Sequence, residues 1–335
     1  MADKYIKPSG QGGDYTTLAA WEAQNLDLVT ATAIENAIID GDWTGITDST
    51  ATSINGWTTN ASYYINIYTT AAARHSGKWD STKYRLSITG QYDTAIDNYA
   101  DYVYITGLQI SGSHALWARY GINSASTGAS TKFGIDKCII VNFGGTGAYG
   151  IQVADAAGYI RNTIIYGSTN SFYYGIYFSS VNAGTWVLNN VTVYNCSNKG
   201  IYPRYGSGHS IENCVSMAGT QDFNYDFGGT GSINNNVSSD ATADDAGGIG
   251  HLINKTASNQ FVSLTGGSED FHVKDTAADI YNTGKDLSGV FTDDIDGGTR
   301  SGTWDIGADE YVAAGGLSIP VAKHVRSLSP NFHVY

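Results

Sequence analysis

The chain has 335 residues and a net charge of −13 at neutral pH, with an isoelectric point near 4.7. This acidic balance argues against nucleic acid and against anionic membrane surfaces as partners, because both attract basic patches. No apolar run approaches the roughly 20 residues of a membrane span, so the sequence predicts none. Glycine (41 residues) and tyrosine (24) are abundant while proline (4) is scarce, which is typical of many tight turns between half-buried strands.

The first 33 residues predict a short strand followed by a capping helix. Residues 5–13 have the composition of a strand and a loop, and the pattern is helical from Asp14 to Leu28. Three apolar side chains of this helix can share one face: Leu18, Trp21 and Leu26. The start of the helix can be capped by Asp14, Thr16 or Thr17. The opening residues contain no apolar signal-peptide core, so the sequence predicts no export signal.

Residues 34–110 contain short apolar or alternating runs that indicate less regular strands. The clearest runs are Ile38-Ile39, Tyr64–Tyr68, Leu86–Ile88 and Tyr102–Ile105. A polar insert at residues 71–83 interrupts them and is the most basic part of the body of the protein. Its basic side chains are Arg74, His75, Lys78 and Lys83.

One six-residue phrase, close to Ile-x-Asn-x-Ile, recurs at intervals of 22 to 30 residues between Val103 and Ser239. Its copies begin at Ile105, Ile135, Ile160, Leu188, Ile211 and Ile233. A second phrase, Gly-Ile, lies between copies and begins at Gly121, Gly150, Gly175 and Gly200. A repeat of this length predicts stacked coils, each made of about three short strands and three turns.

The third residue of each phrase predicts a ladder of asparagines. In order, these residues are Gly107, Lys137, Asn162, Asn190, Asn213 and Asn235. Stacked coils place equivalent residues about 4.8 Å apart, so each amide can bond the coils above and below. Asparagine also tolerates the left-handed backbone of a sharp turn. The alternating positions that follow are expected to face the core: Leu108 and Ile110, Cys138 and Ile140, Thr163 and Ile165, and Val191 and Val193.

Together these features resemble the right-handed parallel β-helix proteins of the pectate-lyase-like superfamily, over roughly residues 5–311. The resemblance implies an all-β, right-handed parallel β-helix (a solenoid) with an N-terminal capping helix and a C-terminal extended tail. A leucine-rich repeat lacks support, because no Leu-x-x-Leu-x-Leu series occurs. The expected parts are 1–33 (strand and capping helix), 34–268 (β-helix), 269–311 (closing segment) and 312–335 (linker and docking tail). The superfamily includes lyases, hydrolases, adhesins and phage spikes, so the activity stays open.

Residues 269–311 end in Trp304-Asp-Ile-Gly-Ala-Asp-Glu-Tyr311, a phrase that resembles the closing segment of many bacterial and phage β-helix proteins. We expect a structural closure in which Arg300 meets nearby carboxylates. The alternative is a calcium site at Asp293, Asp294 and Asp296, whose spacing lacks the full calcium-loop pattern. No other cofactor is expected, and the histidines show no paired metal-ligand spacing.

Residues 312–335 contain two of the four prolines and no acidic side chain. A basic, partly apolar tail on an acidic body predicts a docking arm for a neighbouring subunit or a larger assembly, with Lys323, Arg326 and Phe332 as contacts. The alternative is a frayed terminus.

Two kinds of catalysis suit a β-helix. Glycoside hydrolysis needs two carboxyl groups roughly 5–9 Å apart. The outward row formed by the second residue of each phrase brings no two acids together: Thr106, Asp136, Arg161, Asn189, Glu212 and Asn234. Asp222 and Asp226, near Glu212, form the best acidic cluster, and solvated turn carboxylates are the alternative interpretation.

Polysaccharide β-elimination needs a basic side chain beside a cation. Lys199, Arg204 and His209 lie close in the sequence, with Asp155 nearby in the stack. Arg204 follows Pro203 in a way that resembles the basic residue of pectate lyases, although no complete motif surrounds it. Ordinary surface charge is the alternative.

Tyrosine clusters give the best binding signal. Tyr173, Tyr174, Tyr177, Tyr202 and Tyr205 can stack on sugar rings or contact a protein, and packing on strand faces is the alternative. The three cysteines, Cys138, Cys196 and Cys214, are too few for a disulfide framework and are expected to be small buried side chains.

The opening Lys4-Tyr-Ile-Lys-Pro and the following Gly-Asp-Tyr-Thr-Thr-Leu also resemble β-helix proteins of tailed phages. The resemblance favours a non-enzymatic virion structural protein, either a capsid-surface decoration protein or a spike. It would form a homotrimer, attach to other virion proteins through its C-terminal tail and bind a host-surface glycan. The alternative is a secreted polysaccharide lyase or glycoside hydrolase that acts on acidic polysaccharide.

Overall fold

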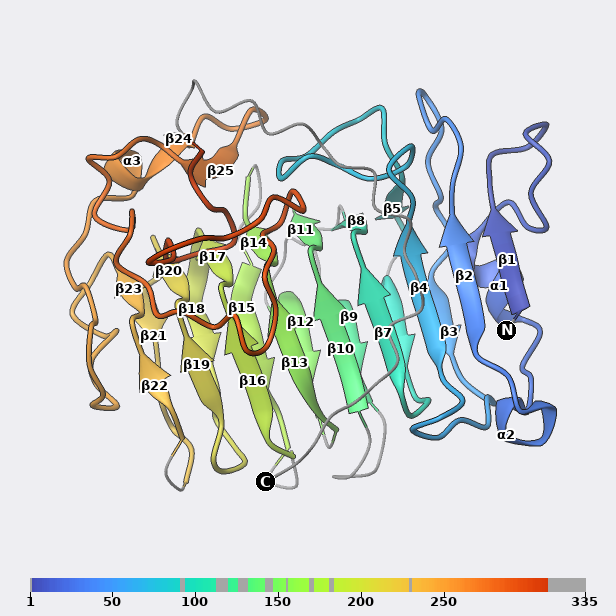
Figure 1. The fold of residues 1–335 in the computed structure, drawn as a ribbon, viewed down its shortest axis with the longest axis horizontal. Coiled ribbons are helices and arrows are strands. Elements are labelled where there is room, and N and C mark those ends of the chain that lie inside the picture. The colour runs from blue at the N-terminus through green and yellow to red at the C-terminus, as the bar shows by residue number, and fades with distance from the viewer. Residues whose placement is uncertain are drawn as a thin grey trace.

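The computed structural model describes residues 2–90, 94–112, 120–125, 132–141, 147–154, 156–168, 172–180, 184–228 and 231–312. The described strands form three parallel sheets that stack along one axis (Figure 1). Sheet 1 contains β1 (Ala2–Ile6), β2 (Glu35–Ile39), β4 (Ile65–Thr69), β7 (Val103–Thr106), β10 (Lys132–Asp136), β13 (Ala157–Arg161), β16 (Trp186–Asn189), β19 (Ser210–Glu212) and β22 (Ile233–Asn234).

The other two sheets have seven described strands each. Sheet 2 contains β5 (Arg85–Ile88), β8 (Gln109–Gly112), β11 (Ile139–Val141), β14 (Ile164–Tyr166), β17 (Thr192–Tyr194), β20 (Val215–Met217) and β23 (Val237–Ser238). Sheet 3 contains β3 (Thr52–Ile54), β6 (Ile96–Asn98), β9 (Tyr120–Ser124), β12 (Tyr149–Val153), β15 (Phe172–Phe178), β18 (Cys196–Tyr202) and β21 (Gln221–Phe223). From β4 onward the chain visits the three sheets in turn, which confirms a parallel β-helix of about seven turns.

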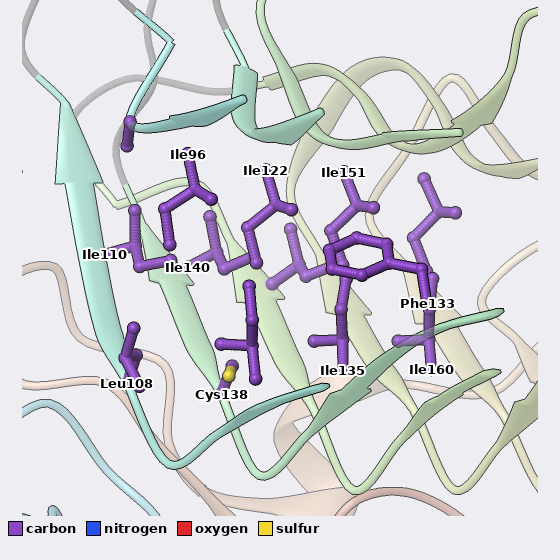
Figure 2. Packing of buried hydrophobic residues seen from close by; sticks show 14 of the residues in the cluster. Ile96, Leu108, Ile110, Ile122, Phe133, Ile135, Cys138, Ile140, Ile151 and Ile160 are labelled. Carbon is purple, nitrogen blue, oxygen red and sulfur yellow. The ribbon is translucent and has the colours of Figure 1, made fainter. Parts of the chain in front are cut away.

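The strand register confirms the predicted repeats. Ile135 pairs with Ile105 on one side and with Ile160 on the other, so the first phrase stacks on itself. The predicted core positions are buried, and their side chains form columns along the axis (Figure 2). Burial of such columns is the main stabilising contribution, at roughly 25 cal/mol for each Å² of apolar surface. The three cysteines are free and buried, as expected.

The capping helix is shorter than predicted. Thr17 caps α1 (Leu18–Glu22), whose Trp21 stacks on Trp57 at 5.1 Å and covers the first turns. A single helix from Asp14 to Leu28 is wrong, because Asn25 takes a left-handed φ of 45° and a second helix, α2 (Leu28–Ala31), follows. Leu26 therefore does not share the buried face and is 38% exposed.

The closing segment, residues 269–311, comes after α3 (Ala257–Gln260) and β24 (Phe261–Ser263), and its first strand, β25 (Asp270–Val273), pairs antiparallel with β24. It returns along the stack on the flank where sheets 1 and 2 meet (Figure 1). We call this side of the β-helix the ladder flank, because the predicted asparagine ladder lies beneath the segment.

The ladder backbone is as predicted, but its amides have another use. Asn162, Asn190, Asn213 and Asn235 have φ between 45° and 56°. Among the described residues one ladder amide bonds another, from Asn213 to Asn190 at 3.2 Å, and the amide of Asn162 also donates to Asp136 of the neighbouring coil at 3.4 Å. The amides donate mainly to carbonyl oxygens of the closing segment, at Asp293, Asp305, Gly307, Lys285 and Thr283. The ladder therefore holds the closing segment more than it ties coil to coil.

Arg300 confirms the predicted closure. It is 4% exposed and its guanidinium lies 3.1 Å from Glu310. It also donates to the carbonyl oxygens of Gly307 and Ala308 and to the side chain of Asn162. These charge-assisted bonds compensate the desolvation of a buried cation.

The insert at residues 71–83 packs beneath the closing segment. His75 is 3% exposed and contacts the carbonyl oxygen of Lys137, while Lys78 lies 3.4 Å from Asp270.

No helix in the described part of the chain is long and apolar enough to cross a membrane. The predicted docking residues Lys323, Arg326 and Phe332 lie outside the described residues.

Candidate functional site

The outward side of sheet 3 has a continuous row of tyrosines. Tyr149 pairs with Tyr120 on one side and Tyr174 on the other, and the row continues from Tyr174 to Lys199. A second row pairs Tyr177 with Tyr202. We call this surface the tyrosine face, with members Tyr120, Tyr149, Tyr173, Tyr174, Tyr177 and Tyr202.

The Gly-Ile phrases explain why this face is regular. Each isoleucine points inward, and the glycine before it lies close to sheet 2. A Cβ on Gly150 would lie 2.4 Å from the side chain of Ile165, and one on Gly175 would lie 2.4 Å from Val193. Glycine therefore allows sheets 2 and 3 to approach, and the residue before it faces outward.

The tyrosine rings pack mainly on one another. The rings of Tyr149 and Tyr174 stack with centroids 5.0 Å apart, and Tyr177 lies 5.4 Å from Tyr202. Stacked rings turn their faces toward neighbouring rings, so a ligand would meet ring edges and hydroxyl groups. Burial raises the pKa of Tyr149 to about 12 and also raises the pKa of Tyr174. The hydroxyl groups of Tyr149 and Tyr174 are therefore neutral hydrogen-bonding groups at neutral pH.

Two cations stand at one end of the tyrosine face. The amine of Lys199 lies 3.6 Å from the ring centre of Tyr202, and the guanidinium of Arg204 donates to the hydroxyl of Tyr177 at 3.1 Å. Neither cation forms an ion pair with a carboxylate within 4 Å among the described residues. Burial lowers the pKa of Lys199, while Asp226 acts in the opposite direction. We call Lys199 and Arg204 the basic end.

An open depression of about 430 Å³ adjoins the basic end. It is lined by Arg204, Tyr205, Gly206, Asp226, Phe227 and Gly228. The guanidinium of Arg204 lies over the ring of Tyr205 at 4.7 Å, which covers one face of that ring. The depression therefore offers a cation, a carboxylate and aromatic edges to a ligand.

The four candidate catalytic residues fall in different surroundings. Arg204 and Asp226 line the depression, whereas Asp222 is buried and accepts backbone N–H groups of Gly219 and Ser239. Burial raises the pKa of Asp222. Glu212 belongs to sheet 1 and pairs with Lys285 of the closing segment at 2.6 Å. Burial would raise the pKa of Glu212, but Lys285 and Ser232 hold it below the ordinary value.

Part of the tyrosine face could be predicted from the sequence. Tyr173, Tyr174, Tyr177 and Tyr202 lie on it, and Tyr205 lines the adjacent depression. Tyr120 and Tyr149 were not among the predicted binding residues. The signal was present, because the residues directly before the four Gly-Ile phrases are Tyr120, Tyr149, Tyr174 and Lys199.

The other predicted lyase residue, His209, is buried. Its ring accepts the N–H of Trp186 and contacts the carbonyl oxygen of Tyr205 at 2.8 Å. Burial lowers its pKa, so it is a neutral structural side chain at neutral pH. Asp155 lies outside the described residues.

The three predicted calcium ligands have separate contacts. Asp293 pairs with Lys137, Asp294 accepts the N–H groups of Asp296 and Gly298, and Asp296 lies 3.1 Å from His272. Burial raises the pKa of Asp294 to about 6. Of the three, Asp296 belongs to a group with His272 and Asp309 whose ligand atoms lie within 4.8 Å of one another.

No family model, curated protein or solved structure matches the chain.

Proposed function

We propose that this protein is a non-enzymatic β-helical structural protein that binds an acidic glycan along its tyrosine face. One observation carries the proposal: a row of tyrosines spans successive turns and ends at two cations, Lys199 and Arg204, without carboxylate partners among the described residues. On a chain with a net charge of −13, such cations next to an open depression favour an anionic ligand.

The geometry supports an extended ligand. Successive turns repeat the same side chain about every 4.8 Å, so a chain of similar sugar units can meet similar contacts along the axis. Phenol hydroxyls both donate and accept hydrogen bonds, which suits the hydroxyl groups of a sugar. Arg204 can bind a carboxylate through two parallel N–H groups, while Lys199 adds a point charge.

We further propose, from the resemblance to tailed-phage proteins, that the setting is a virion surface and that the assembled form is a homotrimer. In this arrangement residues 312–335 attach the protein to the capsid or tail, and the β-helix presents the tyrosine face to a host-surface glycan. Electron microscopy of the full chain tests the trimer, and mass spectrometry of purified virions tests the location.

Binding is tested with immobilised uronate-rich, sulfated and neutral polysaccharides. The parent protein should bind acidic chains and release them at high salt, because counter-ions screen the contacts. The variant Lys199→Gln/Arg204→Gln should bind about 10-fold or more weakly, since a hydrogen bond to a charged group contributes about 1.5–3 kcal/mol. Lys4→Gln/Lys132→Gln removes the same charge elsewhere and should bind like the parent. Equal binding of both double variants, or no binding to any acidic chain, would overturn the proposal.

A polysaccharide lyase is the second candidate. It is favoured by the lowered pKa of Lys199, which burial brings closer to that of a catalytic base, beside Arg204 and the open depression. A lyase would release unsaturated sugars, detected by their ultraviolet absorbance, from the acidic chains that bind. Arg204→Ala should abolish this product. If no acidic chain that binds yields the product, the lyase proposal fails and glycan binding remains as the proposed function.

A further inference from the structure

We propose that His272, Asp296 and Asp309 form a binding site for a divalent transition-metal ion, of which Zn²⁺ is the probe. The three residues come from β25, from the turn after Ile295 and from the final phrase of the closing segment. Their nitrogen and oxygen ligand atoms all lie within 4.8 Å of one another. This inference is independent of glycan binding, because the cluster belongs to the ladder flank.

Asp270 orients the histidine. Nδ1 of His272 contacts the carboxylate of Asp270, and its other nitrogen, Nε2, lies 3.1 Å from Asp296. A carboxylate that holds one imidazole nitrogen leaves the second nitrogen aimed at the metal, as in carboxylate–histidine–zinc arrangements. Lys78 lies 3.4 Å from Asp270 and balances the charge of this supporting carboxylate.

Asp309 is a mostly buried carboxylate that can supply one of the ligand atoms. Its side chain is 5% exposed, and Oδ2 accepts the N–H of Val273 at 2.7 Å. For its other oxygen, Oδ1, the described residues supply no hydrogen-bond donor. A carboxylate oxygen that receives no hydrogen bond from the described residues keeps its lone pairs free to bind a cation.

The insert closes the site from the opposite side. A Cβ on Gly77 would lie 2.1 Å from Asp296 and 2.4 Å from Nε2 of His272, and its left-handed φ of 70° also favours glycine there. Asp296 is exposed, and its side chain can adjust to the roughly 2.0–2.2 Å bonds that Zn²⁺ forms with carboxylates. Three protein ligands leave a fourth position for water.

The ligand types indicate the class of metal. Calcium and magnesium prefer all-oxygen sites, whereas an imidazole with carboxylates suits zinc and neighbouring transition metals. Arg300, the buried cation of the same segment, pairs with Glu310. A divalent ion would therefore fasten three parts of the closing segment against the insert and stabilise the ladder flank.

The test uses the full chain after treatment with a chelator, followed by titration with Zn²⁺, Mn²⁺ or Ca²⁺ in a calorimeter. We expect one equivalent of Zn²⁺ to bind and to raise the melting temperature. Asp270→Asn should weaken binding by roughly 10- to 100-fold. His272→Gln/Asp309→Asn should abolish it, and Asp286→Asn, an exposed carboxylate of the same segment, should bind like the parent.

Because the double variant can lose its fold, Co²⁺ absorbance of the parent gives a second readout, with d–d bands expected from a histidine and carboxylate site. The proposal is overturned if the parent binds no Zn²⁺, because the three side chains would then form only an ion-pair network within the protein. It is also overturned if only Ca²⁺ binds, or if the folded double variant retains parental Zn²⁺ affinity.

Discussion

The ladder flank and the tyrosine face are two sides of the same stack, and they differ in what covers them. On the ladder flank, asparagine amides, Arg300 and Lys285 find partners in the closing segment. On the tyrosine face, the described residues offer no comparable cover, and two cations keep no carboxylate partner there. The chain therefore uses one flank for its own closure, and no described segment closes over the other in the same way.

This difference shows how a repetitive fold separates stability from recognition. The polar side chains that fasten the closing segment most firmly, those of Asn190 and Arg300, are buried and hydrogen-bonded, so changing one should cost stability. The polar residues of the tyrosine face are partly exposed, so changing one should affect binding with little effect on the fold. The expected effects on the free energy of unfolding decrease in the order Arg300, His75, Asn190.

The largest loss is expected for Arg300→Ala. Removing the cation leaves Glu310 and several carbonyl oxygens buried without a donor, which costs about 3–5 kcal/mol. Urea denaturation with circular dichroism measures the change. Arg204→Ala is the matched control and should change stability by less than about 0.5 kcal/mol. Equal losses for the two variants would contradict the comparison.

A pH-dependent loss is expected at His75. Burial lowers its pKa to about 4, with Arg74 acting in the same direction and Asp296 and Asp80 opposing. The unfolded chain binds the proton first, so the stabilising contribution is complete above about pH 6.5 and is lost as the pH falls toward 4. Relative to that of His75→Gln, the free energy of unfolding of the parent should fall by up to about 3 kcal/mol across this pH window.

Denaturation series at pH 7, 5.5 and 4.5 measure that difference. Because the carboxyl groups of the closing segment titrate in both proteins, the comparison with His75→Gln isolates the imidazole. A constant difference between the two proteins at all three pH values would show that His75 does not titrate as proposed.

A smaller loss is expected for Asn190→Gly, which keeps the left-handed backbone but removes the amide. Three hydrogen bonds are lost, two donated to Asp305 and Gly307 and one accepted from Asn213, at a cost of about 1–3 kcal/mol. Asn235→Gly removes one bond, to Thr283, at a less buried position, and should cost less. Hydrogen exchange should show faster opening of the closing segment in Asn190→Gly. Unchanged exchange there would mean that the ladder does not hold it.

The stack could be predicted from the sequence because its information is local and repeated. Each copy of the first phrase places an isoleucine, valine or leucine in the core, and the third residue of each of the six copies takes a left-handed φ. The end of the capping helix was missed because Asn25 acts as a stop within a pattern that otherwise reads as helical.

The contacts of the ladder flank could not be predicted, because they join residues far apart in the chain. Asn162 meets Arg300, and His272 meets Asp296 and Asp309, without any regular spacing between them. The partners of the ladder amides were assigned to neighbouring coils because the sequence gives no sign that another segment covers them. The tyrosine face is intermediate between the predictable stack and the unpredictable ladder flank. Its main row can be predicted, because the residue before each Gly-Ile phrase takes the same position in successive coils.

The most direct test of the comparison is oxidative footprinting of tyrosines by mass spectrometry, with and without a uronate oligosaccharide. The account predicts that the ligand protects Tyr174 and Tyr177 on the tyrosine face, while Tyr281 and Tyr311 on the ladder flank keep their reactivity. Equal protection of both pairs, or protection of the ladder flank alone, would contradict the proposal that the tyrosine face, over which no described segment closes, is the binding surface.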